Sequence, residues 1–155
     1  YYKVEPEATF DADGYYHSQD GGHLDPQGYL HWTGRLSNII KTGGANVSPE
    51  EVDAAIATLP GVRRTQTVGL PHDTLSEIVV SCIVPAHGIT LREDEVVAHL
   101  KQRLASFKVP RKVLFFEETE LSVTGSDKVK VDGVRQLAAA RLGVRTLRTL
   151  ASTEI

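Results

Sequence analysis

Residues 34–51 read GRLSNIIKTGGANVSPEE, and this stretch decides the fold of the chain. Two short β candidates, residues 38–41 and 46–47, flank the flexible Thr-Gly-Gly of residues 42–44. A helix start follows at once, because the serine of Ser-Pro-Glu-Glu can cap a helix, the proline suits its first position and the second glutamate completes a capping box. The stretch therefore predicts a short β-hairpin that runs directly into a helix.

Strand and helix patterns alternate downstream of this stretch. Strands are expected at residues 65–70 and 78–84, with a Pro-His-Asp turn at residues 71–73 between them. The second of these strands is apolar almost throughout, so we expect it to be the central strand. The remaining elements expected are a helix behind a capping box at residues 90–93, a strand at residues 113–116, a polar loop at residues 121–127 and a last helix at residues 132–142.

These elements predict an α+β fold for residues 37–142, with the order ββ-α-β-β-α-β-α. The expected architecture is a short hinge β-hairpin and a three-stranded sheet flanked by helices. Residues 1–36 are too few to own a core, so we interpret them as the terminal β segment of a truncated N-terminal domain. Residues 143–155 have a weak pattern and are expected to be a tail.

The first 36 residues contain a short repeat. The sequence DADGYYH at residues 11–17 recurs as DPQGYLH at residues 25–31, and each copy is a turn signal that leads into an aromatic strand start. Strands are therefore expected near residues 15–18 and 29–33, joined by a glycine-rich turn at residues 20–22.

Composition excludes several classes of protein. The 155 residues include 17 basic and 20 acidic ones, and the resulting net charge of −3 argues against a dedicated nucleic-acid binder. Contents of 41% hydrophobic and 24% charged residues are typical of a globular chain. No apolar run reaches the roughly 18 residues of a membrane span, so we expect no transmembrane segment and a cytoplasmic location.

Cysteine, histidine and methionine usage adds three expectations. Cys82 is the single cysteine and lies in an apolar strand pattern, which favours a small core residue over a nucleophile. The six histidines show no His-x3-His spacing, so no metal site is expected. The chain contains no methionine and shows no cleavable leader, and we therefore expect it to be a piece of a larger protein.

Three features could carry chemistry. Lys41 beside Gly43 and Gly44 suits an anionic group, since glycines let backbone N–H groups approach a ligand, but a surface hairpin with solvated charges has the same pattern. Lys128 on a polar loop could stabilise a charge that develops on a transferring oxygen, or the loop could be a plain connector. Asp20 could hold a ribose diol, although a lone aspartate is more often a turn residue.

Four segments in this order resemble the adenylate-forming superfamily, which contains acyl-CoA synthetases, luciferases and peptide-synthetase adenylation domains. They are GYYHSQD at residues 14–20, the stretch at residues 34–53, FKVP at residues 107–110 and SVTGSDK at residues 122–128. The resemblance covers about residues 13–142, and it is closest to the C-terminal domain of fatty-acid-CoA-ligase-like enzymes. Three positions depart from the family pattern: Gln19 stands where glycine is usual, Ser37 where the hinge is often Asp or Lys, and Asp127 where glycine precedes the lysine.

The resemblance implies an ATP-dependent acid–thiol ligase. A carboxylate first attacks ATP with Mg²⁺ to give an acyl-adenylate and pyrophosphate, and the thiol of CoA then displaces AMP while the C-terminal domain rotates between the steps. The implied partners are the missing N-terminal domain and a carboxylic acid, with a fatty acid as one candidate, and none of the cofactors is expected to bind tightly to this segment alone. The implied nucleotide-binding roles are the ribose hydroxyls for Asp20, the ribose or phosphate for Arg35 and approach to the adenylate for Asn46. The other implied roles are catalysis for Lys128 and Lys41, the CoA path for Gly43 and Gly44, and the hinge for Ser37.

Two other functions share these residues. An adenylation domain that loads a carrier protein would differ only in its thiol acceptor. A non-catalytic homologue could keep the fold as an interaction module, with Gln19 and Asp127 as its altered positions.

Overall fold

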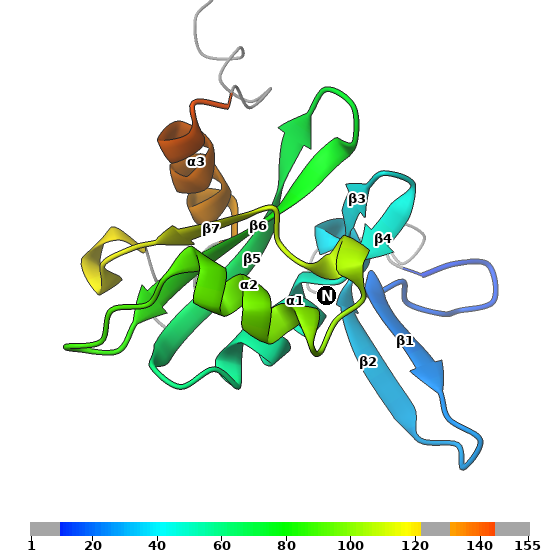
Figure 1. Ribbon diagram of the computed structural model, residues 1–155. Coiled ribbons are helices and arrows are strands. Elements are labelled where there is room, and N and C mark those ends of the chain that lie inside the picture. Colours follow the sequence, from blue (N-terminus) through cyan, green and yellow to red (C-terminus); the bar gives the residue numbers. More distant parts are fainter. Residues whose placement is uncertain (1–9, 122–130, 145–155) are drawn as a thin grey trace, which may run out of the picture. The chain divides into compact units, whose positions relative to one another are not determined.

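The computed structural model describes residues 10–121 and 131–144, and Figure 1 shows its elements. Internal contacts divide the chain into two compact units, Tyr1–Ser37 and Asn38–Ile155. The short 3-10 helix Leu36–Asn38 spans the point where the first unit ends and the second begins. Among the described residues, no helix has the length and apolar content needed to cross a bilayer.

The first unit is built on strands β1 (Asp20–Leu24) and β2 (Leu30–Arg35), which pair antiparallel with a register shift at residues 21–22. The prediction of a turn at residues 20–22 is wrong, because these residues lie in β1. Residues 15–18 form no strand beyond a single bridge between Phe10 and Tyr16.

The two sequence repeats fold as the same hydrogen-bonded loop. Asp25 Oδ1 accepts the N–H groups of Gln27 and Tyr29, and Asp25 Oδ2 lies 2.9 Å from His31 Nε2. In the first copy the aspartate of residue 11 makes the corresponding bonds to residues 13, 15 and 17. Because the second copy itself supplies the turn between β1 and β2, the glycines at residues 21–22 are left for the strand.

The second unit is an α+β domain, which confirms the predicted fold class. Its elements are β3 (Ile40–Thr42), β4 (Ala45–Val47), α1 (Pro49–Ala57), β5 (Val62–His72), β6 (Ser76–Pro85), α2 (Glu93–Lys101), β7 (Lys112–Phe115) and α3 (Val131–Leu142). The strand order is β4-β3-β6-β5, with β7 parallel to β6. Hairpin β3–β4 therefore joins the three-stranded sheet β5–β6–β7 through the pair Thr42–Ser76.

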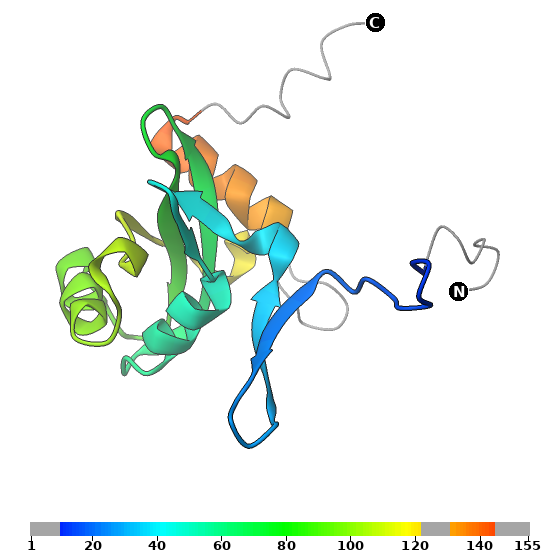
Figure 2. The same ribbon diagram turned by 90° about the vertical axis from the view of Figure 1, so that its right-hand side faces the viewer.

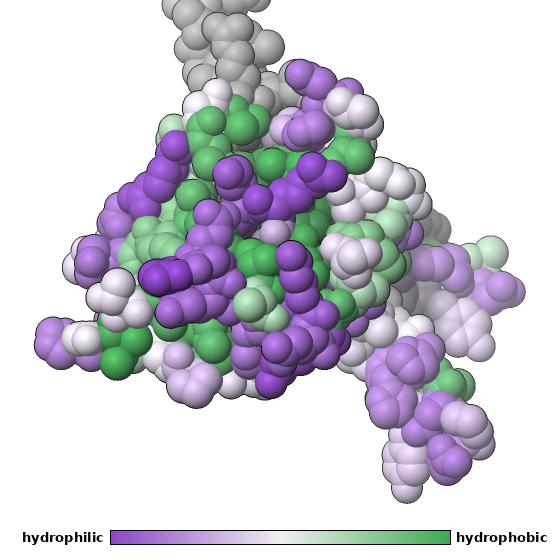
Figure 3. Space-filling model, viewed as in Figure 1, coloured by the Kyte–Doolittle hydropathy of each residue, from purple (hydrophilic) through white to green (hydrophobic). Residues whose placement is uncertain are grey.

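Helices cover both faces of this sheet, with α3 on one side and α1 and α2 on the other (Figure 2). Since side chains alternate along a strand, β6 supplies both cores. Ile78, Val80, Cys82 and Val84 pack with α3, whereas Val79 and Ile83 pack with α1 and α2. Hydrophilic side chains stand out over the region of α1 and α2 on the face shown in Figure 3.

The Cys82 side chain is buried in the core under α3, and this burial raises the pKa of its thiol to about 12. Cys82 is therefore a core residue.

Helix α1 starts at the residue that the sequence predicts, but the Glu51 carboxylate binds Lys108 and does not form the predicted capping box. Ser48 is its N-cap and accepts the N–H of Glu51 at 3.4 Å, and Pro49 occupies the first helical position. The Glu51 carboxylate is bound by Lys108 Nζ at 2.7 Å, which ties the start of α1 to the 3-10 helix Ser106–Lys108.

Two other boundaries differ from the prediction, and two further predictions are not tested. The predicted turn at residues 71–73 is wrong in its first two residues, which continue β5, because the strands pair as far as His72–Ser76. Helix α2 is capped at Arg92 and not at residue 90, because the Glu95 carboxylate accepts the Arg92 N–H at 3.0 Å. Most of the expected loop at residues 121–127, and residues 145–155 of the expected tail, lie outside the described residues.

The half-buried carboxylate of Asp53 links α1 to the sheet. Asp53 Oδ1 accepts the hydroxyls of Thr65 and Thr67 at 2.9 and 2.7 Å, and Asp53 Oδ2 accepts the Thr67 N–H at 3.0 Å. The Thr67 hydroxyl also bonds Ser81 on β6 at 2.7 Å. Burial raises the pKa of Asp53, and the threonine hydrogen bonds oppose that shift without cancelling it.

Replacing Thr67 by valine is expected to reduce the free energy of unfolding by about 2 kcal/mol at pH 7, because it removes a hydroxyl donor from a half-buried carboxylate. The deficit should shrink as the pH falls from 7 towards 4, close to the ordinary carboxyl value of 3.8. The pKa of Asp53 is raised in the folded chain, so folding becomes more favourable as the pH falls through that pKa towards the ordinary value of 3.8. Once the carboxyl is neutral, losing the Thr67 hydroxyl donor costs less free energy of unfolding.

Urea denaturation of the chain at both pH values measures this difference. Ser81→Ala is the matched control, because Ser81 bonds the Thr67 hydroxyl and not the carboxylate, so its deficit should be the same at both pH values. A Thr67→Val deficit that does not change with pH would contradict the assignment.

Candidate functional site

Asp20 and Arg35 lie opposite each other across the β1–β2 hairpin. They are direct partners in the strand register, and Arg35 Nε lies 3.0 Å from Asp20 Oδ1. The Asp20 side chain is 34% exposed and the Arg35 side chain 58% exposed, so both remain open to a ligand. The structure thus brings together two predicted nucleotide-binding residues that are 15 positions apart in the sequence.

Gln19 holds the turn into β1 in a strained conformation. Its φ angle is 63°, in the left-handed region that favours glycine, and its carbonyl accepts the Leu36 N–H at 2.8 Å. This geometry explains why a glycine suits the position. Ser37, the predicted hinge, is exposed and is the last residue of the first unit.

Hairpin β3–β4 carries four of the predicted site residues. Lys41 and Asn46 are direct partners, so their exposed side chains leave the same face of the hairpin. Gly43 and Gly44 form the two-residue turn with φ angles of 55° and 81°, and a turn with two positive φ angles requires residues such as glycine. The side chains of Lys41 and Asn46 are thereby held beside the Gly43–Gly44 turn.

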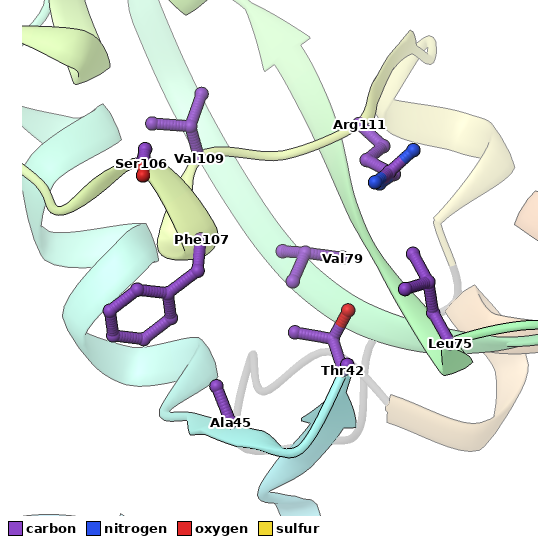
Figure 4. Close-up of a pocket in the computed structure, with 9 residues that line it drawn as sticks. Thr42, Ala45, Leu75, Val79, Ser106, Phe107, Val109 and Arg111 are labelled. Atoms are coloured by element: carbon purple, nitrogen blue, oxygen red, sulfur yellow. The ribbon is translucent and has the colours of Figure 1, made fainter.

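A pocket of about 210 Å³ opens beside this tip (Figure 4). Figure 4 shows Phe107 near Ala45 at one end of the pocket and Arg111 near Leu75 at the other, with Thr42 and Val79 between them. Gly43, Ser106 and Val109 complete the lining. The Arg111 backbone N–H donates to Val79 O at 2.9 Å, which fixes the chain that carries the guanidinium. A pocket with an aromatic ring and a cation at opposite ends suits a ligand that has both a flat and an anionic part.

Sequence reasoning missed three residues of this site. Phe107 and Arg111 line the pocket, and Glu77 Oε2 accepts the Lys41 N–H at 2.8 Å. Phe107 belongs to the FKVP segment at residues 107–110, so a motif in the sequence points to it. Glu77 lies 36 residues from Lys41, and no local pattern points from one to the other.

Apart from the predicted hinge residue Ser37, the predicted site residues fall into three groups. Asp20 and Arg35 are together in the first unit, whereas Lys41, Gly43, Gly44 and Asn46 share one hairpin of the second unit. Lys128 lies outside the described residues. Within the part of the chain that the structure describes, no group of three or more His, Cys, Asp or Glu side chains could hold a metal ion.

Comparison with known proteins gives a family match. The family described as AMP-binding enzyme C-terminal domain matches residues 51–128. The chain is 42% identical over 127 residues to a Rhodococcus jostii protein named 3-[(3aS,4S,7aS)-7a-methyl-1,5-dioxo-octahydro-1H-inden-4-yl]propanoyl:CoA ligase. It is 38% identical over 132 residues to an oxalate–CoA ligase of Arabidopsis thaliana.

Solved structures agree with the sequence relatives. The crystal structure of ATP-bound MatB from Rhodopseudomonas palustris superposes with a TM-score of 0.76 at 34% identity, over 84% of this chain and 26% of that one. The two sequence matches cover 80% and 83% of this chain. The chain spans 25% of the length of each of these two relatives.

Replacing Gln19 by glycine is expected to leave the first unit at least as stable, and up to about 1 kcal/mol more stable, because glycine adopts φ angles near 63° without strain. Hydrogen exchange of the Leu36 amide, which donates to the residue 19 carbonyl, reports the local opening free energy.

Gln27→Gly serves as the comparison, because the φ angle of Gln27 is not positive and glycine there should reduce stability by about 0.5–1 kcal/mol. Faster exchange of the Leu36 amide in Gln19→Gly than in the unchanged chain would show that the conformation of Gln19 carries no strain.

Proposed function

Because the chain belongs to the family of AMP-binding enzyme C-terminal domains, we propose that it is the C-terminal part of an ATP-dependent acyl-CoA synthetase. The chain spans about a quarter of its relatives, so the reaction belongs to a whole enzyme in which this segment completes the active site. The observation that carries the proposal is the Asp20–Arg35 pair, since it joins the two residues that the resemblance assigns to the nucleotide.

Asp20 and Arg35 would bind the ribose and phosphate of ATP. The Asp20 carboxylate can accept hydrogen bonds from two hydroxyls of a ribose diol, as acidic residues do in other nucleotide sites. The Arg35 guanidinium orients that carboxylate through its Nε and retains further N–H groups for a phosphate or ribose oxygen. These residues fit ATP, and Mg²⁺ would be held chiefly by the phosphates and by residues of the N-terminal domain.

Adenylation would use Lys128, and thioester formation would use the β3–β4 hairpin. A lysine ammonium near the attacking carboxylate and the ATP phosphates stabilises the charge that moves to pyrophosphate. In the second step Lys41 and Asn46 would face the adenylate, and rotation about Ser37 would exchange one set of residues for the other.

The pocket beside Gly43 favours CoA as the thiol acceptor. Arg111 offers a cation for a phosphate, and the Phe107 ring is 49% exposed and can stack on a flat base. A phosphopantetheine arm on a carrier protein has no adenine for this ring, so a carrier-loading adenylation domain uses the pocket less well. A fatty acid is one candidate for the carboxylic acid, and a cytoplasmic location fits the need for ATP and CoA.

The isolated 155-residue chain is expected to show only background ATP–pyrophosphate exchange, because most ATP contacts and the acyl pocket are proposed to lie in the N-terminal domain. The assay uses the chain at micromolar concentration with ATP, Mg²⁺ and a panel of carboxylic acids. Clear turnover by the chain alone would refute this division of the active site.

Two substitutions in the whole enzyme should affect different half-reactions. Lys128→Ala is expected to slow adenylate formation by about 100-fold or more, as the loss of one preorganised electrostatic group does. Gly44→Ala is expected to slow mainly thioester formation, because a φ angle of 81° strains any side-chain-bearing residue in the hairpin turn.

Single-turnover measurements separate the two steps. Gly88→Ala is the matched control, since Gly88 also has a positive φ angle, 75°, and an added Cβ atom would meet nothing within 4 Å at either glycine, but Gly88 lies outside the hairpin. The assignment of Lys128 fails if Lys128→Ala adenylates within a few-fold of the unchanged enzyme.

A further inference from the structure

The carboxylate of Glu77 binds the backbone of the β3–β4 hairpin. Glu77 Oε2 accepts the Lys41 N–H at 2.8 Å, and the Glu77 side chain is half-buried at the start of β6. A hydrogen bond from an amide to an ionised acceptor is stronger than a bond between two neutral groups. Glu77 therefore fixes the backbone position of the lysine to which the thioester step is assigned.

Few other backbone contacts attach β3 to the sheet. The ladder between β3 and β6 consists of the single pair Thr42–Ser76, and the Gly43 N–H donates to Leu75 O at 2.9 Å. Lys41, Thr42 and Gly43 are thus each held by one of three consecutive residues, 75–77. The side chain of Glu77 thus holds β3 to β6 at Lys41, next to the single ladder pair Thr42–Ser76.

The structure leaves room for this carboxylate at Gly69. A Cβ atom on Gly69 would lie 2.7 Å from Glu77 Oε1 and 2.9 Å from Glu77 Cδ, closer than such contacts occur. The φ angle of Gly69 is not in the left-handed region, so its backbone would accept any residue. The same Cβ atom would lie 3.1 Å from Ile40 Cγ2. Space for the Glu77 carboxylate and for Ile40, and not backbone conformation, therefore favours a glycine here.

We propose that Glu77 is a positioning residue for thioester formation, and that Gly69 permits its placement. By holding the Lys41 amide, Glu77 keeps Lys41 in register with Asn46 and keeps the Gly43–Gly44 turn against Leu75. Adenylation, which is assigned to Lys128, does not depend on this bond. The proposal rests on the proposed function for its catalytic consequence, whereas the hydrogen bond itself can be tested in the chain alone.

The first test follows the Lys41 amide by hydrogen exchange in the 155-residue chain. Glu77→Ala should speed its exchange by about 10- to 100-fold, which corresponds to the loss of a hydrogen bond to a charged group. Glu77→Gln keeps an acceptor oxygen and should restore most of the protection. Glu93→Ala is the matched control, because Glu93 Oε1 accepts the Val113 N–H at 3.0 Å elsewhere in the same unit. It should expose the Val113 amide and leave that of Lys41 unchanged.

The second test measures both half-reactions in the whole enzyme. Glu77→Ala is expected to lower the rate of thioester formation by about 10-fold or more, with adenylation within twofold of the unchanged enzyme and near-normal activity in Glu77→Gln. Gly69→Ala should have the same effect, because its methyl group displaces the carboxylate. Combined with Glu77→Ala it should add little, since Glu77→Ala vacates the space that the methyl group takes and Ile40 Cγ2, at 3.1 Å, has to move only slightly.

Three results would overturn the proposal: unchanged exchange of the Lys41 amide in Glu77→Ala, an equal loss in both half-reactions, or a Gly69→Ala effect that adds in full to that of Glu77→Ala. If the unchanged enzyme forms adenylate but no thioester, the proposed CoA function fails together with the catalytic part of this proposal. The exchange of the Lys41 amide then still decides whether Glu77 positions the hairpin.

Discussion

Strand β6 is the constraint on which the second unit depends, because both of its faces and both of its edges are occupied. Alternate side chains enter the core under α3 and the core under α1 and α2, while β5 pairs along one edge and β3 and β7 share the other. A strand buried on two faces must be apolar almost throughout. Ser81 is the buried polar exception, and its hydroxyl is satisfied by Thr67 in the network that anchors Asp53.

The hairpin that is proposed to act in thioester formation lies beside the start of β6, where the dense strand pairing ends. The ladder between β3 and β6 consists of one residue pair, Thr42–Ser76, at the start of β6. Lys41 and the rest of the hairpin lie outside this pair. The rigid sheet and the hairpin are joined by the buried side chains of Ile40 and Val47, by the backbone of residues 75–76 and by the carboxylate of Glu77. A glycine-tipped hairpin with one buried and one exposed face can approach a ligand without loosening the core.

Local sequence signals predicted much of this structure, and long-range contacts account for what was missed. The Ser-Pro-Glu-Glu helix start and the apolar central strand follow from neighbouring residues, and the order of the motifs points to Asp20 and Arg35. The turn expected at residues 20–22 is wrong because the glycines lie in strand β1, whereas the aspartate-capped repeat at residues 25–31 forms the turn. The bonds from Asp53 to Thr67 and from Glu77 to Lys41 join residues 14 and 36 positions apart, and no periodicity encodes such pairs.

The most direct test of the account is the reaction of the intact enzyme that carries this chain. Purified enzyme would be incubated with ATP, Mg²⁺, CoA and a panel of carboxylic acids of increasing length, and acyl-adenylate, AMP and CoA thioester would be quantified. The account predicts an acyl-adenylate with at least one acid and its conversion to a CoA thioester with release of AMP. Absence of adenylate with every acid would contradict it and favour a non-catalytic homologue, whereas adenylate that passes only to a carrier protein would contradict the assignment of CoA.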